Sequence, residues 1–185
     1  MKHKCIIYVH GGGWTHGEPS EIDRYKDRLG CDVIAVPYKL IPHTTMGGQI
    51  SQVAEAIRDA KRDYTKVYAM GYSAGGQLAV MAARKEKVDG VITLCAPLDF
   101  SKVAAMRLIR FLLLSFDPIR AADSDRTDTL VIHGDTDETV SVDAAKNYVR
   151  KAKNSSLTIV PKKGHTLTVL DDAEVRRRIK TLLER

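Results

Sequence analysis

One stretch of the 185-residue chain decides its fold: Val67-Tyr-Ala-Met-Gly71-Tyr-Ser73-Ala-Gly75-Gly-Gln-Leu78. It places a Gly-x-Ser-x-Gly sequence between an apolar, strand-like run and a helix-like run. Such a strand-to-helix turn is sharp, and the serine at its apex projects its hydroxyl above the sheet. Glycine at positions 71 and 75 avoids collisions with neighbouring backbone. A chance match at a glycine-rich turn is the alternative, but the flanking strand and helix favour Ser73 as a nucleophile.

Outward from this turn, short apolar runs alternate with amphipathic patterns. Six runs are predicted strands: 4–9, 32–36, 66–70, 90–95, 129–133 and 157–160. Five stretches space apolar residues three or four positions apart and are predicted helices: 19–29, 48–63, 74–84, 142–153 and 171–183. This alternation predicts one α/β domain over residues 1–185, with a mainly parallel sheet flanked by helices.

The composition is that of a globular protein, with 44% apolar and 28% charged residues. It excludes disordered, collagen-like and disulfide-scaffold classes, and no apolar run reaches the roughly 18–20 residues of a membrane span. The three cysteines (5, 31 and 95) form no Cys-x-x-Cys pair, which predicts reduced, buried thiols. The apolar part of the N-terminus is too short for a signal peptide, so we expect a cytoplasmic protein.

The net charge is +6, because 29 Lys and Arg stand against 23 Asp and Glu. These charges are scattered along the chain. The one basic cluster, at 176–180, lies on a predicted helix with an apolar stripe and nearby acidic residues, which indicates a solvent-facing helix surface. We therefore predict no nucleic-acid partner.

A glycine loop, His10-Gly-Gly-Gly-Trp14, follows the first predicted strand directly. Glycine backbone allows close approach of N–H donors to an oxyanion. A phosphate-binding loop would instead need Gly-Lys-Ser/Thr or Gly-x-Gly-x-x-Gly leading into a helix, and neither occurs. We predict that the N–H groups of Gly12, Gly13 and Ala74 form an oxyanion hole.

A serine nucleophile needs a base, which follows the acid in the chain order of this kind of fold. His165 lies after the last predicted strand and is the only histidine beyond His133, so we predict that it is the base. His16 and His43, in loops near the predicted site, are secondary candidates. His10 and His133 end strands beside glycines and are expected to brace loops.

Three acidic residues compete to orient the base: Asp135, Asp137 and Glu138, all in the loop after strand 129–133. Asp135 lies one residue past Gly134, where aspartate is a common turn former. Asp137 lies deeper in the loop and is favoured. The site requires no metal or cofactor, and neither a His-Glu-x-x-His motif nor paired-cysteine spacing occurs.

The chain resembles an α/β-hydrolase, close to the hormone-sensitive-lipase-like carboxylesterases and the BD-FAE-type esterases. The glycine loop resembles the family's HGGG oxyanion segment, and Gly71-Tyr-Ser-Ala-Gly-Gly-Gln-Leu-Ala79 is similar to GDSAGGNLA. Tyr38-Lys-Leu-Ile-Pro42 resembles Tyr-Arg-Leu-Ala-Pro, and Ala96-Pro-Leu-Asp99 resembles the segment after the next strand. His133-Gly-Asp-Thr-Asp137 and Gly164-His165 match the acid and base positions, which supports Asp137.

The resemblance implies the strand order 2-1-3-4-5-6, with strand 32–36 at an edge that needs cover or pairing, as in a homodimer. Tyr72 replaces a frequent acidic residue beside the nucleophile, and His43 stands where Glu often follows the proline. Only nine residues precede His10, so we expect a compact hydrolase without the family's opening strands and large cap.

The apolar segment 101–118 has three interpretations: a lid or pocket wall extending to about residue 120, a dimer or membrane contact, or ordinary core. The first is favoured because lids are often inserted after this strand. Trp14, Tyr72 and Leu98 adjoin the motifs and are expected to contact substrate.

Together these features predict a serine carboxylester hydrolase that acts on small or short-chain acyl esters. An amide-type hydrolase such as an arylformamidase is the nearest alternative, because HGGxW segments also occur in kynurenine formamidases. A catalytically inactive hydrolase fold used as a binding module is a third.

Overall fold

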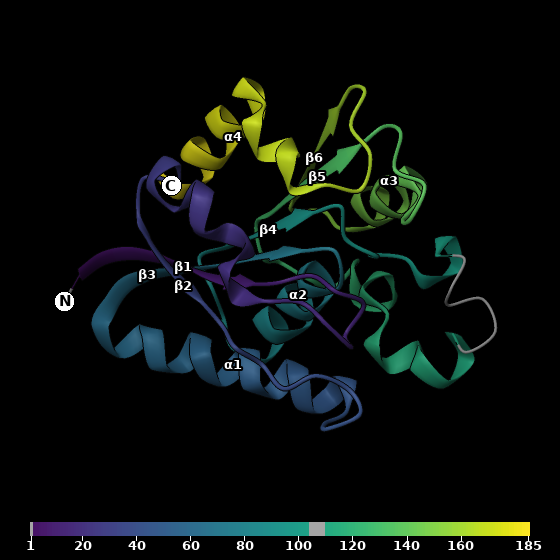
Figure 1. Ribbon diagram of the computed structural model, residues 1–185, viewed down its shortest axis with the longest axis horizontal. Coiled ribbons are helices and arrows are strands. Elements are labelled where there is room, and N and C mark those ends of the chain that lie inside the picture. Colours follow the sequence, from purple (N-terminus) through teal and green to yellow (C-terminus); the bar gives the residue numbers. More distant parts are fainter. Residues whose placement is uncertain (1, 104–109) are drawn as a thin grey trace.

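The computed structural model describes residues 2–103 and 110–185, and its centre is one six-stranded sheet (Figure 1). The strands are β1 (Lys2–Val9), β2 (Asp32–Ala35), β3 (Tyr64–Tyr72), β4 (Gly90–Leu94), β5 (Thr129–Gly134) and β6 (Ser155–Val160). They lie in the order β2-β1-β3-β4-β5-β6, and every neighbouring pair is parallel. The predicted α/β class, parallel sheet and strand order are confirmed.

Across residues 2–103 and 110–185, four α-helices and five 3₁₀-helices lie between the strands or follow the last of them. The α-helices are α1 (Met46–Asp63), α2 (Ala74–Lys85), α3 (Val142–Lys151) and α4 (Ala173–Leu183). The 3₁₀-helices are η1 (Pro19–Arg28), η2 (Phe100–Lys102), η4 (Arg110–Phe116), η5 (Pro118–Ala121) and η6 (Leu167–Asp171). The predicted helix 171–183 begins two residues later because Asp172 caps it, accepting hydrogen bonds from the N–H groups of Glu174 and Val175.

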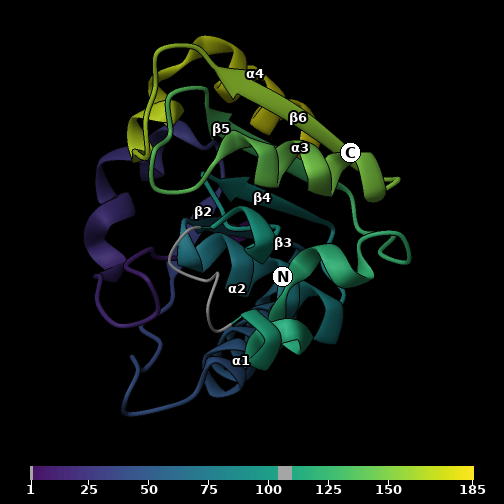
Figure 2. The same ribbon diagram turned by 90° about the vertical axis from the view of Figure 1, so that its right-hand side faces the viewer.

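Helices cover both faces of the sheet, so the molecule has three layers. On one face α1, α2 and α3 pack against side chains such as Ile7, Val9 and Val131. On the other face η1, η6 and α4 pack against Ile6, Tyr8 and Ile132. Figures 1 and 2 show α1 and α4 on opposite sides of the strands. Burial on both faces explains why the strands are continuous apolar runs rather than alternating ones.

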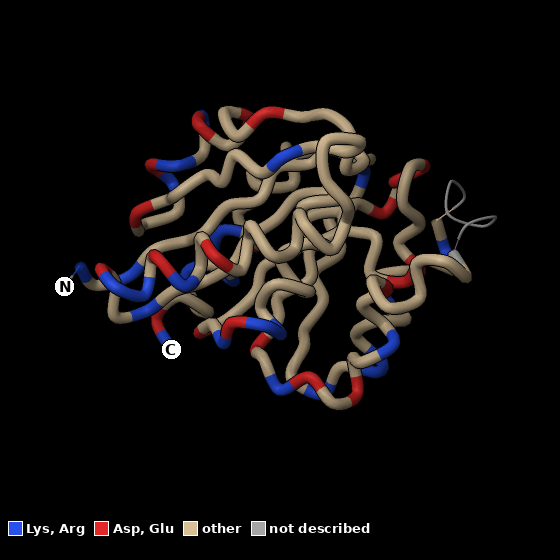
Figure 3. Tube along the Cα trace, turned by 90° about the horizontal axis from the view of Figure 1, so that it is seen from below, with Lys and Arg blue, Asp and Glu red and all other residues tan. Residues whose placement is uncertain are grey.

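Strand β2 forms one edge of the sheet, as predicted, and pairs on one side with β1. The side chain of Ile34 on this strand is 37% exposed. Basic and acidic residues are interspersed over the surface helices and loops rather than gathered by sign (Figure 3). Among the described residues, no helix has the length and apolar character needed to cross a membrane.

Candidate active site

The turn between β3 and α2 is a strained nucleophile elbow. Ser73 has φ 50° and ψ −125°, a region that non-glycine residues rarely adopt. Its N–H donates to the carbonyl of Leu94 on β4 (2.8 Å), which fixes the turn to the sheet. A Cβ added at Gly71 would lie 2.2 Å from the Gly75 oxygen, and one at Gly75 would lie 2.1 Å from the Val9 oxygen. Both positions therefore require glycine.

Ser73, His165 and Asp137 form a continuous hydrogen-bonded chain at the carboxyl ends of the strands. Nε2 of His165 lies 2.8 Å from Oγ of Ser73, and its Nδ1 lies 2.8 Å from Oδ2 of Asp137. The structure thus brings together the three residues that the sequence selected. Asp135 and Glu138, the competing acids, are both exposed.

The Asp137 carboxylate is buried and fully provided with donors. Its Oδ1 accepts hydrogen bonds from the N–H groups of Thr139 (2.9 Å) and Val140 (2.8 Å). Burial acts to raise the pKa of Asp137, but hydrogen bonds from His133, His165 and the Val140 N–H outweigh it and hold that pKa well below its usual range. Asp137 is therefore an anion at neutral pH.

The glycine loop after β1 is held in an unusual backbone conformation. Gly12, Gly13 and Trp14 all have positive φ (104°, 56° and 67°), and the Gly12 carbonyl accepts hydrogen bonds from the N–H groups of Thr15 and His16. A Cβ at Gly12 would lie 1.9 Å from the His16 oxygen, so only glycine fits there.

Side chains from three separate segments of the chain anchor this loop. Oε1 of Glu21 accepts from the N–H of Gly11 (2.8 Å), and the Tyr38 hydroxyl donates to the His10 carbonyl (2.9 Å). The ring of Tyr38 also stacks on that of His10, with centroids 4.2 Å apart. Nε1 of Trp14 donates to Oε1 of Gln77 on α2 (3.0 Å). The loop is therefore fixed before any ligand arrives.

Three backbone N–H donors lie beside Ser73. Within residues 2–103 and 110–185, the N–H groups of Gly12, Gly13 and Ala74 have no hydrogen-bond partner. All three residues line the same cavity as Ser73. Free N–H groups at a helix start and in a glycine loop can stabilise a developing negative charge.

The cavity over Ser73 has a volume of about 460 Å³ and a largely apolar wall. Its lining includes the predicted Trp14 and Tyr72, and also His16, Glu21, Pro97, Val103, Thr139 and Val140. The predicted substrate contact Leu98 does not line it: this side chain is completely buried in the core on the α1, α2 and α3 side of the sheet, whereas its neighbour Pro97 lines the cavity.

Tyr72 contacts the predicted base, His165, through both its hydroxyl and its ring. Its hydroxyl donates to the His165 carbonyl (3.0 Å), and the two rings lie 5.3 Å apart. Of the secondary histidine candidates, His16 lines the cavity, whereas His43 is exposed and does not.

Glu21, Thr139 and Val140 are site residues that the sequence did not indicate. Glu21 lies on a polar, charge-rich helical stretch whose residues read as solvent-facing, and no local motif links it to the glycine loop. Thr139 and Val140 lie two and three residues after Asp137, so their place in the loop between β5 and α3, called the acid loop below, is the signal that could have found them.

The predicted lid segment 101–120 is described only in part, because residues 104–109 lie outside the described residues. Val103 lines the cavity, while Phe116 and Leu113 pack against the core. Phe111 and Leu112 are exposed (69% and 82%). The described part thus contributes one residue to the cavity wall.

One group of metal-ligating side chains occurs in the described part of the chain: Cys95, Asp137 and His165, with ligand atoms within 4.8 Å of one another. His165 and Asp137 already use their facing atoms on each other. Burial raises the pKa of the Cys95 thiol to about 11, which disfavours the thiolate that binds metals. The hydrogen-bonded chain to Ser73 accounts for this group without a metal.

The family model for the α/β-hydrolase fold matches residues 6–164, and the chain belongs to this family. A curated relative, the versiconal hemiacetal acetate esterase of Aspergillus parasiticus, is 31% identical over 101 residues, which cover 48% of this chain and 32% of the relative.

Two solved structures resemble the whole chain in fold. One is esterase 2 of Thermogutta terrifontis with bound propionate, at 18% identity and a TM-score of 0.78. The other is the acetyl ester-xyloside bifunctional hydrolase of Caldicellulosiruptor lactoaceticus, at 18% identity and a TM-score of 0.80. Each alignment covers 99% of this chain and 82% of the other.

Proposed function

We propose that the protein is a serine carboxylester hydrolase that works through Ser73, His165 and Asp137. The observation that carries this proposal is the chain of two 2.8 Å hydrogen bonds from a strained serine to a buried carboxylate. Acyl transfer also requires an oxyanion hole. The three N–H groups beside that serine, which have no partner among the described residues, would form it.

The geometry supports a two-step reaction. Oγ of Ser73 attacks the ester carbonyl carbon while its proton passes to Nε2 of His165. The bond to the alcohol oxygen breaks, and His165 returns the proton to that oxygen. Water then attacks the acyl-enzyme, giving its proton to His165, and the acid leaves as the proton returns to Ser73.

Asp137 and the backbone donors stabilise the charges of this reaction. The anionic Asp137 accepts the Nδ1–H of His165, which selects the tautomer with a free Nε2 and stabilises the imidazolium that forms. The N–H groups of Gly12, Gly13 and Ala74 face the oxyanion. Because the loop and elbow are already fixed, little reorganisation is needed at the transition state.

We infer a preference for small acyl groups. A cavity of about 460 Å³ must hold both the acyl and the alcohol parts of the ester. The curated relative is named for an acetate ester, and one structural neighbour carries propionate. We therefore expect kcat/KM to fall as the acyl chain of a p-nitrophenyl ester lengthens from two carbons to twelve.

Substitution of the nucleophile tests the proposal. Ser73→Ala removes only the hydroxyl, and we expect a loss of about 10³-fold or more in kcat with an unchanged thermal unfolding profile. A fluorophosphonate probe should label the wild type but not this variant, since only an activated serine reacts. Activity above a tenth of the wild-type value in Ser73→Ala would overturn the assignment. Turnover of N-formylkynurenine well above that of the short esters would favour the amide-type alternative.

A further inference from the structure

His133 is a buried histidine beside the catalytic acid, at the end of β5. It is completely buried. Its Nε2 lies 2.9 Å from the carbonyl oxygen of Val140 and 3.2 Å from Oδ2 of Asp137. Both neighbours accept hydrogen bonds and neither can donate, so Nε2 must carry a proton and share it between them.

The second ring nitrogen of His133 supports this tautomer. Within the described part of the chain, Nδ1 has no hydrogen-bond partner. A buried N–H without an acceptor costs more than a buried lone pair, because the donor loses its only hydrogen bond. The proton therefore belongs on Nε2, where it faces Asp137.

His133 completes the set of donors around Asp137. Oδ1 takes two backbone N–H groups, those of Thr139 and Val140, which come from the acid loop itself. Oδ2 lies between the two imidazoles, with His165 at 2.8 Å and His133 at 3.2 Å. Of these donors, His133 alone extends from the sheet, so it ties the carboxylate to the rigid part of the fold.

The same N–H also closes the acid loop. By holding the Val140 carbonyl, His133 clamps the two ends of the segment between positions 133 and 140, which carries Asp137 at its centre. Val140 in turn lines the cavity over Ser73.

We propose that His133 is a positioning residue of the reaction: it shares its Nε2–H with Asp137 and holds Oδ2 in line with Nδ1 of His165. The inference rests on the proposed function. A residue that only braced the loop would need the bond to Val140 alone, whereas the proposed role also requires the bond to Asp137. Loss of the bond to Asp137 should raise the free energy of the transition state, in which the imidazolium forms, and should not weaken substrate binding.

Three substitutions separate these roles. His133→Leu fills the space without a donor. The side-chain amide of His133→Gln reaches the place of Nε2, whereas that of His133→Asn reaches only the place of Nδ1. We expect kcat to fall about 10–100-fold in the Leu and Asn variants with KM changed less than about threefold, and Gln to restore kcat to within about fivefold of wild type. If the Leu variant does not fold, the Gln and Asn pair still decides.

Thr93→Val is the matched control, because it also removes a buried polar group from the sheet centre. The Thr93 hydroxyl has no hydrogen-bond partner in the described residues, and the residue lies within β4, in register with Gly71 of β3 and Val131 of β5. We expect wild-type kcat and KM. A loss like that of His133→Leu would mean that buried polar changes in the sheet lower activity generally, and would overturn the specific role of His133.

Proton NMR of the free protein supplies a readout that needs no turnover. The Nδ1–H of His165 bonded to Asp137 should give a low-field resonance, assigned by its loss in Asp137→Asn. We expect it to persist in His133→Gln and to weaken or disappear in His133→Leu and His133→Asn. Wild-type kcat and an unchanged resonance in these two variants would overturn the inference. A wild type that shows the His133-dependent resonance but neither hydrolyses esters nor reacts with fluorophosphonate would overturn the proposed function instead.

Discussion

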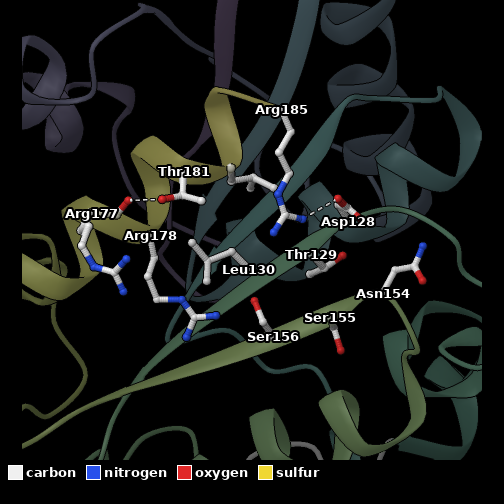
Figure 4. Close-up of a pocket in the computed structure, with 11 residues that line it drawn as sticks. Asp128, Thr129, Leu130, Asn154, Ser155, Ser156, Arg177, Arg178, Thr181 and Arg185 are labelled. Atoms are coloured by element: carbon white, nitrogen blue, oxygen red, sulfur yellow. Dashed lines mark hydrogen bonds and ion pairs between the residues drawn. The ribbon is translucent and has the colours of Figure 1, made fainter.

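The two ends of the sheet carry cavities of similar size but opposite chemistry. The cavity over Ser73, at the carboxyl ends of the strands, measures about 460 Å³, and the one at the amino ends of β5 and β6 about 360 Å³. Figure 4 shows three arginines of α4 and the C-terminus around the second cavity. Each has a partner: Arg177 binds Glu174, Arg178 donates to the Leu157 carbonyl, and Arg185 binds Asp128.

At the carboxyl ends of the strands, by contrast, strained backbone occurs together with N–H groups that have no hydrogen-bond partner among the described residues. In the described part of the chain, four non-glycine residues have positive φ. All lie after the carboxyl end of a strand: Trp14, Ser73, Cys95 and Lys162. Strain of this kind is retained where it serves a function. The candidate site is therefore distinguished from the other cavity less by volume than by the strained backbone of Trp14 and Ser73 and by the N–H groups without partners among the described residues.

The largest effect that sharpens this contrast is expected at Asp137. Asp137→Asn keeps the shape of the side chain but favours the wrong tautomer of His165, so kcat should fall on the order of 10³–10⁴-fold with little change in KM. Steady-state kinetics with a short acyl ester measure it.

Asp135→Asn is the matched control, because Asp135 is exposed two positions earlier in the same loop. Asparagine serves in such turns as well, so the cost should stay below about tenfold. If Asp135→Asn were the inactive variant, the acid would be misassigned by two residues. If both variants remained active, another carboxylate would orient His165.

These expectations also show how far the sequence alone could lead. Apolar periodicity and the Gly-x-Ser-x-Gly turn depend on neighbours in the chain, so they predicted the layers, the order of elements and the elbow. The segment 19–29 was expected to be an ordinary helix and is the 3₁₀-helix η1 instead, beginning at Pro19 without a side-chain cap. Tertiary packing of Ile22 and Tyr25 supports it, and local propensity does not.

Contacts between segments that are distant in the sequence could not be predicted, and the reason is physical. The hydrogen bond from Gly11 to Glu21 and that from His133 to Asp137 depend on side-chain directions that only the folded chain sets. Similarly, nothing local distinguishes Leu98, which the core buries, from Pro97, which lines the cavity.

A smaller effect is expected from the glycine loop. Gly12→Ala places a methyl group where the His16 carbonyl lies, on backbone with φ 104°, so the loop must shift and its N–H groups leave their positions. Loss of oxyanion donors costs on the order of 10²–10³-fold in kcat.

Gly30→Ala serves as the control for strain by itself. Gly30 also has positive φ (72°), but an added Cβ would meet nothing within 4 Å, and the residue lies outside the cavity over Ser73. We expect lower thermal stability with kcat and KM unchanged. Equal losses of kcat in the two variants would show that strain, and not the oxyanion donors, limits the reaction.

The smallest effect is expected at the amino end of the sheet, and it should be one of stability only. Nη1 of Arg178 donates to the Leu157 carbonyl of edge strand β6 (2.8 Å), so Arg178→Met leaves a strand carbonyl without this donor. A hydrogen bond of this kind is worth about 1 kcal/mol, which urea unfolding can resolve.

Arg177→Met is the control, because it removes only an exposed pair with Glu174 and should lower the free energy of unfolding less than Arg178→Met. Both variants should keep kcat/KM within about twofold of wild type, because the two arginines line the cavity at the amino ends of β5 and β6 and not the one over Ser73. A fivefold loss of esterase activity in either variant would show that the two ends of the sheet are coupled, and would break the contrast between them.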